Sequence, residues 1–248
     1  IEEQKNELID SITYAQRIQK AVLAGDPNQK LMKDSFVLFK PKDIVSGDFH
    51  WYYEKDDQFY LCVADCTGHG VPGAFLTMLG TTFLNEIITL NPGISPAEIL
   101  NKLRSRIINA LSQSTTPGNK DGMDISLIKV NCASHQAEWA GAYNPLIVIR
   151  SSENDIINTK TIKSDDFNLF EIKADKQPIS ISEKMTPFTN HSIQLLKDDC
   201  IYLYSDGFSD QFGGKNGKKY LSLNLKKKLI ESLLKKIPKF VSGYYNLL

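Results

Sequence analysis

Residues 64–74 are Ala-Asp-Cys-Thr-Gly-His-Gly-Val-Pro-Gly-Ala, an acidic residue followed by a glycine-rich turn and small residues. Residues 58–65 are mostly aromatic, apolar or β-branched, which predicts a strand that ends at Asp65. Residues 71–90 are predominantly apolar and predict a helix, with a proline in the first turn, where a missing N–H costs little. The segment therefore predicts a strand, a tight turn and a helix, with Asp65 and His69 at the junction.

A β-hairpin is predicted for residues 44–53 and 58–65, with its tip at residues 54–57. If the tip loop has an even length, Asp48 in the first strand lies directly opposite Asp65. Directly opposed like charges destabilise a sheet, whereas a hard cation between the two carboxylates would reverse the sign. An odd-length loop would place the two side chains on opposite faces and weaken this argument.

A third carboxylate has the same context, because the apolar residues 200–205 predict a strand that ends in Asp206-Gly207. Each Asp alone could cap a turn, but three at strand ends favour a metal cluster over separate turns. His69 lies between two glycines, where it is either a proton donor to a leaving oxygen or a surface turn residue. Free N–H groups at residues 71–73 could help to bind an anion.

The remaining elements predict an α+β fold with layered sheets, because helices cluster between two runs of strands. Ser95 and Glu98 form a capping-box pattern that opens a helix to about Leu111. A basic helical stretch follows Lys218 and extends to Pro238. The further predicted strands are residues 36–39, 125–130, 137–142, 146–150, 167–172, 192–196 and 200–205.

Residues 1–24 predict a helix, stopped by the Gly-Asp-Pro-Asn stretch at 25–28. Its apolar residues recur at intervals of seven, at Ile1, Leu8 and positions 15 and 22. This pattern fits either an amphipathic helix packed on the domain or the end of a coiled coil from an upstream region. We expect residues 1–25 to be a coiled-coil-like linker helix and residues 26–248 to be one domain.

The charge balance is neutral, with 29 Lys and Arg against 29 Asp and Glu. A chain without net charge has no long-range field for nucleic acid, so we expect no nucleic-acid partner. No run of about 18 apolar residues occurs, so we expect no membrane span in this segment. No GxxxxGK[ST], GxGxxG or GxSxG segment occurs, which argues against a nucleotide-binding loop and a serine hydrolase.

The four cysteines (Cys62, Cys66, Cys132 and Cys200) lack the paired spacing of a zinc site. Cys62 and Cys66 lie four residues apart in a predicted strand, so both face one side as small apolar groups. We expect core thiols and a cytoplasmic location, although the full-length protein could be membrane-tethered. The chain begins at Ile1 without a charged-then-apolar leader, and we expect it to be part of a longer protein.

Five motifs together resemble the metal-dependent type 2C (PPM) protein phosphatases, in their bacterial SpoIIE/RsbU-like branch. The second and fifth motifs, Asp-x-x-Gly-His-Gly and Ser-Asp-Gly, are the most specific, and the five occur in the family's order. They are residues 40–49 (Lys-Pro-Lys-Asp-Ile-Val-Ser-Gly-Asp-Phe), 64–74, 138–145, 177–179 and 204–210 (Tyr-Ser-Asp-Gly-Phe-Ser-Asp). The resemblance covers roughly residues 36–220.

The resemblance implies a four-layer αββα sandwich of two antiparallel sheets flanked by helices, with an N-terminal helical extension. It also implies a site between the sheets for two or more Mn2+ or Mg2+ ions. Carried over to this sequence, Asp65 would bridge two ions, and the backbone carbonyl of Cys66 would bind one of them. Asp206 would bind the other ion, and Asp48 would bind an ion or its water.

The activity implied by the resemblance is hydrolysis of phosphoserine or phosphothreonine by metal-activated water, in bacterial signalling. Asp65 and His69 are the expected catalytic residues, with His69 as general acid. The expected partners are a phosphorylated regulatory protein, an upstream sensor domain and a second copy bound through the N-terminal helix. A pseudo-phosphatase with an incomplete metal site and a phosphoesterase acting on small molecules are the alternatives.

One departure from the family pattern lies near the C-terminus of the printed sequence. The family ends with an Asp-Asp-x-Thr-like strand whose carboxylates complete the metal site. After Tyr220 this chain has a Lys-rich helical stretch and then residues 238–248, without that motif. We expect the motif to lie outside the printed chain, and its native absence would lower metal affinity.

Overall fold

Two antiparallel sheets form the centre of the computed structural model, which describes residues 1–23, 35–115, 118–151, 156, 159–164, 166–213 and 217–234. The larger sheet has the order β1 (Phe49–Lys55), β2 (Gln58–Cys66), β3 (Met123–Asn131), β4 (Gln136–Ala142) and β8 (His191–Gln194). The smaller sheet has the order β6 (Lys160–Lys163), β7 (Asn168–Ile172), β5 (Leu146–Arg150) and β9 (Cys200–Leu203).

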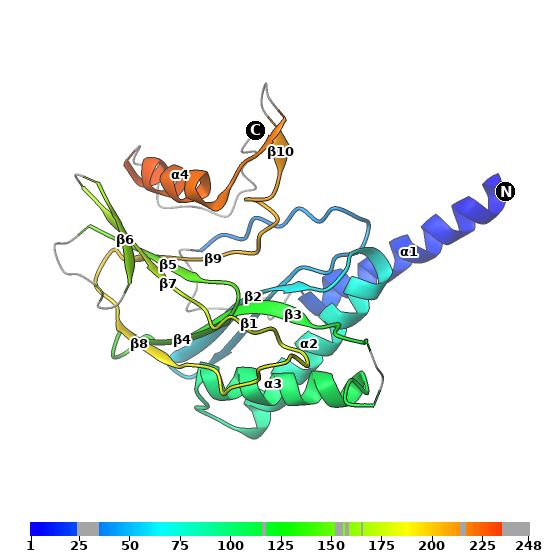
Figure 1. Ribbon diagram of the computed structural model, residues 1–248, viewed down its shortest axis with the longest axis horizontal. Coiled ribbons are helices and arrows are strands. Elements are labelled where there is room, and N and C mark those ends of the chain that lie inside the picture. The colour runs from blue at the N-terminus through cyan, green and yellow to red at the C-terminus, as the bar shows by residue number, and fades with distance from the viewer. Residues whose placement is uncertain are drawn as a thin grey trace.

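Helices cover the outer face of each sheet (Figure 1). Helices α2 (Gly70–Leu90) and α3 (Pro96–Ala110) lie on the larger sheet, and α4 (Ser222–Leu234) lies on the smaller one. Helix α1 (Glu2–Leu23) extends away from this body at its N-terminal end (Figure 1). The predicted four-layer αββα sandwich with a helical extension is confirmed.

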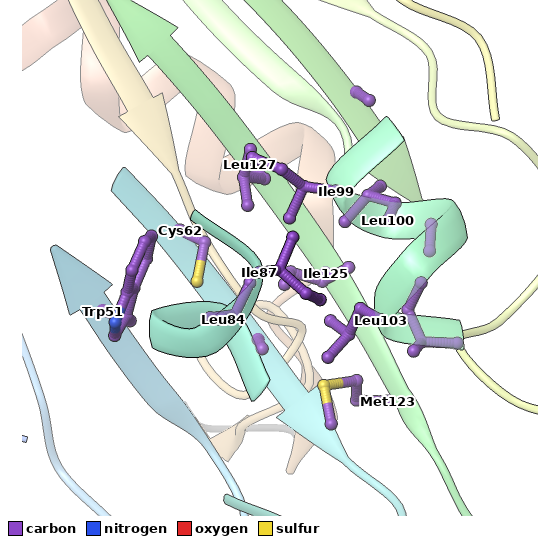
Figure 2. Packing of buried hydrophobic residues seen from close by; sticks show 14 of the residues in the cluster. Trp51, Cys62, Leu84, Ile87, Ile99, Leu100, Leu103, Met123, Ile125 and Leu127 are labelled. Atoms are coloured by element: carbon purple, nitrogen blue, oxygen red, sulfur yellow. The ribbon is translucent and has the colours of Figure 1, made fainter. Parts of the chain in front are cut away.

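Alternation along the strands divides the core into three clusters. Even-numbered residues of β2 pack against α2 and α3, and Figure 2 shows Cys62 there beside Leu84 and Ile87. Odd-numbered residues of β2 face the smaller sheet, where a second cluster includes Trp139 and Leu146. The third cluster lies under α4 and consists of Ile147, Ile149, Leu169 and Ile230.

The β1–β2 hairpin has the predicted even-length tip, a turn at residues 56 and 57 in which Asp56 has φ 54°. The pairs run from Lys55↔Gln58 to Phe49↔Ala64. One step further along the same register places Asp48 opposite Asp65, as predicted. The first strand begins at Phe49 rather than at residue 44, because residues 42–47 bend around the start of α2.

Several predicted elements differ from the structure. The strand predicted at residues 36–39 is wrong, since this segment is irregular and Phe36 and Val37 are exposed. The helix predicted from Lys218 begins at Ser222, because a short hairpin of β10 (Phe212–Gly213) and β11 (Lys218–Lys219) precedes it. The capping box at Ser95 is confirmed.

Three predictions lie outside the described residues: the helix stop at 25–28, the domain boundary at 25 and the segment 238–248. None of the four cysteines, all of which the structure describes, forms a disulfide. Cys62 and Cys66 are buried on the same face, as predicted, whereas Cys132 and Cys200 are only half-buried. Core packing therefore accounts for two of the four.

Helix α2 is long and apolar enough by composition to cross a membrane. It nevertheless packs as a core helix, since Leu76, Leu84, Ile87 and Ile88 are buried against the larger sheet. An apolar helix in the interior of a globular domain passes the same length and composition test, so the helix needs no membrane to be explained.

Candidate metal centre

The two predicted carboxylates of the hairpin lie on the face of the larger sheet that is turned toward the smaller sheet. In β2 the even-numbered residues face the helices, so the odd-numbered Asp65 faces the space between the sheets. The same alternation gives Asp48 this orientation, because Phe49 and Trp51 belong to the helix-side cluster. Strand geometry alone thus brings both side chains to one end of the inter-sheet space.

The third predicted carboxylate joins them from the smaller sheet. Asp206 follows β9, and the carboxyl of Asp65 is in hydrogen-bonding contact with those of both Asp48 and Asp206. The neighbouring Ser205 donates a hydrogen bond from Oγ to Oδ2 of Asp48 at 3.0 Å. The structure therefore assembles Asp48, Asp65 and Asp206, which are 158 positions apart at the extremes, into one group.

Without a counter-charge, the three carboxylates are electrostatically unfavourable in their ionised form. Burial raises the pKa of Asp65 to about 8, with the charges of Asp48 and Asp206 adding to the effect. No described lysine or arginine forms an ion pair with any of the three. A divalent cation would supply the missing positive charge, and carboxylate oxygens are the ligands that Mg2+ and Mn2+ prefer.

The donor set therefore fits the metal ions that the sequence predicts. Among the described residues, no three His, Cys, Asp or Glu side chains are already placed around one point as an ion would need. Contacting carboxyls separate to make room for an ion between them, so small side-chain movements would complete the site.

A fourth carboxylate, Asp124, lies beside the three that were predicted. It is paired directly with Asp65 across β2 and β3. Burial, followed by the charge of Asp206, raises the pKa of Asp124 to about 6. Sequence reasoning missed Asp124 because it selected Asp residues next to glycine-rich turns. A signal was present, since Asp124 lies at the beginning of an apolar strand, as Asp48 does.

Cys66 can contribute only its backbone to such a site. Its side chain lies on the helix face of β2, where burial raises the pKa of the thiol to about 12. A thiol with that pKa stays protonated at neutral pH and is a poor metal ligand. This agrees with the predicted role, which used the carbonyl oxygen alone.

Buried side chains hold the turn that precedes Asp48. The amide of Gln19 in α1 makes two hydrogen bonds with the backbone of Ser46, from Nε2 to the carbonyl oxygen at 2.7 Å and from Ser46 N–H to Oε1 at 3.0 Å. Thr77 in α2 places its hydroxyl 2.9 Å from the carbonyl oxygen of Gly47. Helices α1 and α2 thus fix the entry into the first metal-site strand, and sequence reasoning assigned neither residue a role.

Close backbone contacts fix the same turn against the glycine-rich loop. A Cβ atom on Gly73 would lie 2.7 Å from the carbonyl oxygen of Gly68 and 2.9 Å from Cα of Gly47. Real Cβ contacts are never this short, so the close approach of the three segments requires glycine at 73. The loop that carries Asp65 and the turn that carries Asp48 are therefore packed backbone to backbone.

His69 is the N-cap residue of α2 and contacts Asp43, a residue that sequence reasoning left without a role. Its Nδ1 lies 2.6 Å from Oδ2 of Asp43. The His69 side chain is 70% exposed and that of Asp43 is 37% exposed. The hydrogen-bond partner of the ring is thus Asp43 rather than Asp65, and the ring is open to an incoming ligand.

A surface hollow of about 450 Å³ lies elsewhere, between α2 and α3, and includes Leu90, Asn101 and Arg106 in its lining. These two helices cover the face of the larger sheet opposite to the carboxylates. The hollow holds no carboxylate of the metal centre, so we do not assign it to the same chemistry.

Comparison with known proteins places this arrangement in a family. The family described as Stage II sporulation protein E (SpoIIE) matches residues 55–242. Phosphoserine phosphatase RsbP of Bacillus subtilis (strain 168) is 25% identical over 202 residues, which are 80% of this chain and 45% of RsbP. The chain thus spans under half the length of that relative.

Solved structures share the fold. The SiaA-PP2C domain of Pseudomonas aeruginosa superposes with a TM-score of 0.75 and 30% identity, over 92% of this chain and 84% of that domain. The RsbU and RsbW domains of Rv1364c from Mycobacterium tuberculosis give a TM-score of 0.54 and 19% identity, over 80% of this chain and 48% of that one. The family match over most of the chain and the agreement with the SiaA domain lead to one conclusion: the chain belongs to the SpoIIE family and carries a phosphatase domain of the PP2C type.

Proposed function

We propose that the protein is a metal-dependent serine/threonine phosphatase that acts on a phosphorylated regulatory protein in bacterial signalling. The observation that supports this most directly is the contact of Asp65 with Asp48 and Asp206 at the ends of strands from both sheets. Three carboxylates with no described basic partner are suited to divalent cations and to little else. The family membership supplies the reaction class.

In this proposal Asp48, Asp65, Asp206 and the carbonyl of Cys66 hold two or more Mn2+ or Mg2+ ions. Bound ions of this kind activate water and neutralise charge on a phosphoryl group. The role of the protein is to keep the four oxygen donors at one end of the inter-sheet space. Ser205 supports this by fixing one oxygen of Asp48 with its hydroxyl.

His69 is proposed to protonate the leaving serine oxygen. In the imidazolium form Nδ1–H would donate to Asp43, and Nε2–H would be the group that donates to the leaving oxygen. Asp43 would orient the ring in this scheme and would not itself touch the substrate. The exposure of the ring fits a phosphorylated side chain that arrives from a protein surface.

The proposed substrate is phosphoserine or phosphothreonine in a protein rather than a small phosphate ester. Support comes from the name of RsbP, a phosphoserine phosphatase. A cytoplasmic location, where such a regulatory protein would be met, is part of the same proposal. Turnover of nucleotides or sugar phosphates in preference to phosphopeptides would instead favour the small-molecule alternative.

The central test is Asp65→Asn, assayed with p-nitrophenyl phosphate and a phosphoserine peptide at saturating Mn2+. We expect a loss of at least about 100-fold in kcat/KM, because the residue that contacts both other carboxylates loses its charge. Asp57→Asn, at the opposite end of the same hairpin, is the matched control and should keep full activity.

Two outcomes would count against the proposal. The first is a wild-type protein that hydrolyses neither substrate at saturating Mn2+. The second is an Asp65→Asn variant that keeps both partner binding and biological output, which is the behaviour of a pseudo-phosphatase.

Helix α1 is proposed to link the domain to an upstream sensor and to pair with a second copy. Its last turns are fixed to the domain through Gln19 and Leu23, whereas Ile1, Leu8 and Ile18 are exposed. Exposed apolar residues at helical spacing favour the coiled-coil alternative over a helix packed along its whole length on the domain. Deletion of residues 1–11 should lower the mass in analytical ultracentrifugation, and an unchanged mass would contradict pairing.

A further inference from the structure

Among the described residues, Asp124 is a carboxylate of the metal centre that no hydrogen-bond donor contacts. It is partly buried at the start of β3. Within the described residues its carboxyl accepts no hydrogen bond and forms no ion pair. Asp48, by comparison, accepts a hydrogen bond from Ser205. A partly desolvated carboxylate without a donor is unfavourable, so its position calls for an explanation.

The register of the sheet fixes where the carboxyl of Asp124 lies. Asp124 is the direct partner of Asp65 in the antiparallel β2–β3 ladder. Directly opposed residues point to the same face, with Cβ atoms about 4.5–5.5 Å apart. Asp124 therefore faces the inter-sheet space beside Asp65, and it lies near enough to Asp206 to feel its charge.

Contacts on both sides of Asp124 keep it there. Thr67 N–H donates to the carbonyl oxygen of Gly122 at 2.9 Å, and Gly122 N–H donates to the hydroxyl of Thr67 at 3.1 Å. A Cβ on Gly122 would come within 2.3 Å of the carbonyl oxygen of Ile179, so the segment is closely packed from the other side. The strand start cannot turn Asp124 away without breaking these contacts.

Two like charges in direct opposition across a ladder destabilise a sheet, and a third nearby adds to the cost. A basic neighbour would remove this cost, but no described lysine or arginine pairs with Asp124 or Asp65. A divalent cation shared by the two carboxylates would remove the repulsion while both stay ionised, because it binds the oxygens that otherwise repel each other.

We propose that Asp124 is a further ligand of the divalent cations held by Asp48, Asp65 and Asp206. This inference rests on the proposed function, since it assumes that those three residues bind metal. It assigns the start of β3 to the site, in addition to the three strand ends that the sequence motifs identify. The four carboxylates then come from the residue before β1, from β2 and β3, and from the residues after β9, so each sheet contributes.

The test is titration of the chelator-treated protein with Mn2+ in a calorimeter, which measures binding without any substrate. We expect Asp124→Asn to raise the manganese dissociation constant at least about tenfold, the lower end of what loss of a group at a metal site costs. Asp121→Asn is the matched control, an exposed Asp three residues away in the same segment, and it should bind like the wild type.

Two further measurements separate a ligand from a structural residue. In EDTA at pH 8, Asp124→Asn should melt at a higher temperature than the wild type, because it removes a charge opposite Asp65. Asp124→Glu keeps the carboxylate and should recover part of the lost affinity, whereas a purely structural role predicts that Glu and Asn variants bind Mn2+ alike.

An unchanged dissociation constant in Asp124→Asn, while the wild type binds Mn2+, overturns the assignment of Asp124 and leaves the proposed function standing. A wild type that takes up no Mn2+ overturns both. If Asp124→Asn does not fold, Asp124→Glu and Asp124→Ser decide together. The ligand role is confirmed if the Glu variant binds Mn2+ and melts in EDTA like the wild type while the Ser variant binds Mn2+ at least tenfold more weakly. A Ser variant that binds Mn2+ like the wild type overturns it.

Discussion

The two faces of the larger sheet carry the same strands but very different chemistry. On the helix side, β2 and β3 present Cys62, Ala64, Ile125 and Leu127, all completely buried against α2 and α3. On the other side the same two strands are apolar toward one end of the sheet, with Ile128 in the inter-sheet core, and carry carboxylates at the other end. The helix face is buried along its whole length, whereas the inter-sheet face has an apolar core at one end only.

This difference shows how a strand separates stability from function by alternation alone. Residues 64 and 66 face the helices, and Asp65 between them faces the metal centre. The apolar neighbours fix the backbone so firmly that an unfavourable set of charges can be kept at their side. Changes on the helix face should therefore affect folding, and changes on the inter-sheet face should affect cation binding.

The largest expected effect is a cavity on the helix face. Leu127→Ala removes a completely buried side chain and should lower the free energy of unfolding by about 2–5 kcal/mol, as measured by urea denaturation. The Mn2+ dissociation constant of the protein that remains folded should stay at the wild-type value. A large loss of affinity without a loss of stability would show that the two faces are not separate.

Much of this division is visible in the sequence. The sequence leaves an even-length and an odd-length hairpin tip open, and it predicts that Asp48 lies opposite Asp65 for the even tip, which is the one that the structure has at residues 56 and 57. The carboxylate of Asp206 follows from its place at the end of an apolar strand. These features depend on local periodicity, which a single sequence records directly.

What the sequence could not supply depends on contacts between distant segments. The ring of His69 meets Asp43, and Gln19 meets Ser46, only because α1 and the turn at 42–47 fold over the start of α2. The apolar residues at 36–39 gave a false strand, since none of the described strands pairs with them. Strand β6 was missed because its sequence, Lys-Thr-Ile-Lys, has a single large apolar residue and lies at a sheet edge.

A smaller effect, on both stability and Mn2+ binding, is expected for Gly73→Ala. The new Cβ would lie 2.7 Å from the Gly68 carbonyl oxygen, so the loop after Asp65 must shift at a cost of about 1–3 kcal/mol. The shift also moves the turn before Asp48, so Mn2+ affinity should fall together with the melting temperature. Gly213→Ala, which meets open space, is the control, and equal behaviour of the two variants would contradict this packing argument.

The pH dependence of stability tests the strain on the inter-sheet face. The pKa of Asp65 is about 8 in the folded protein against 3.8 for an ordinary Asp, so the folded state holds the extra proton between these values. The stability that this group contributes is complete below about pH 4 and is lost as the pH rises through 8. Solvent screening at this partly exposed site reduces the loss to about 1–2 kcal/mol.

The measurement is denaturation in EDTA at pH 5 and pH 8 for the wild type and Asp65→Asn. The difference between the two proteins cancels other groups, such as His50, whose pKa is lowered by burial. The wild type should lose stability relative to the variant as the pH rises. The opposite trend would mean that Asp65 is not under the repulsion that a cation is proposed to relieve.

The smallest effect is expected for Ser95→Ala, in the outer helical layer. Ser95 caps α3 by accepting a hydrogen bond from Glu98 N–H, and loss of such a cap costs about 1 kcal/mol. Helix α3 packs on the face of the larger sheet opposite to the carboxylates, so the loss should appear in the unfolding curve and not in the Mn2+ titration. If this distant cap does change Mn2+ affinity, the sheet transmits strain from one face to the other, and the separation by alternation is incomplete.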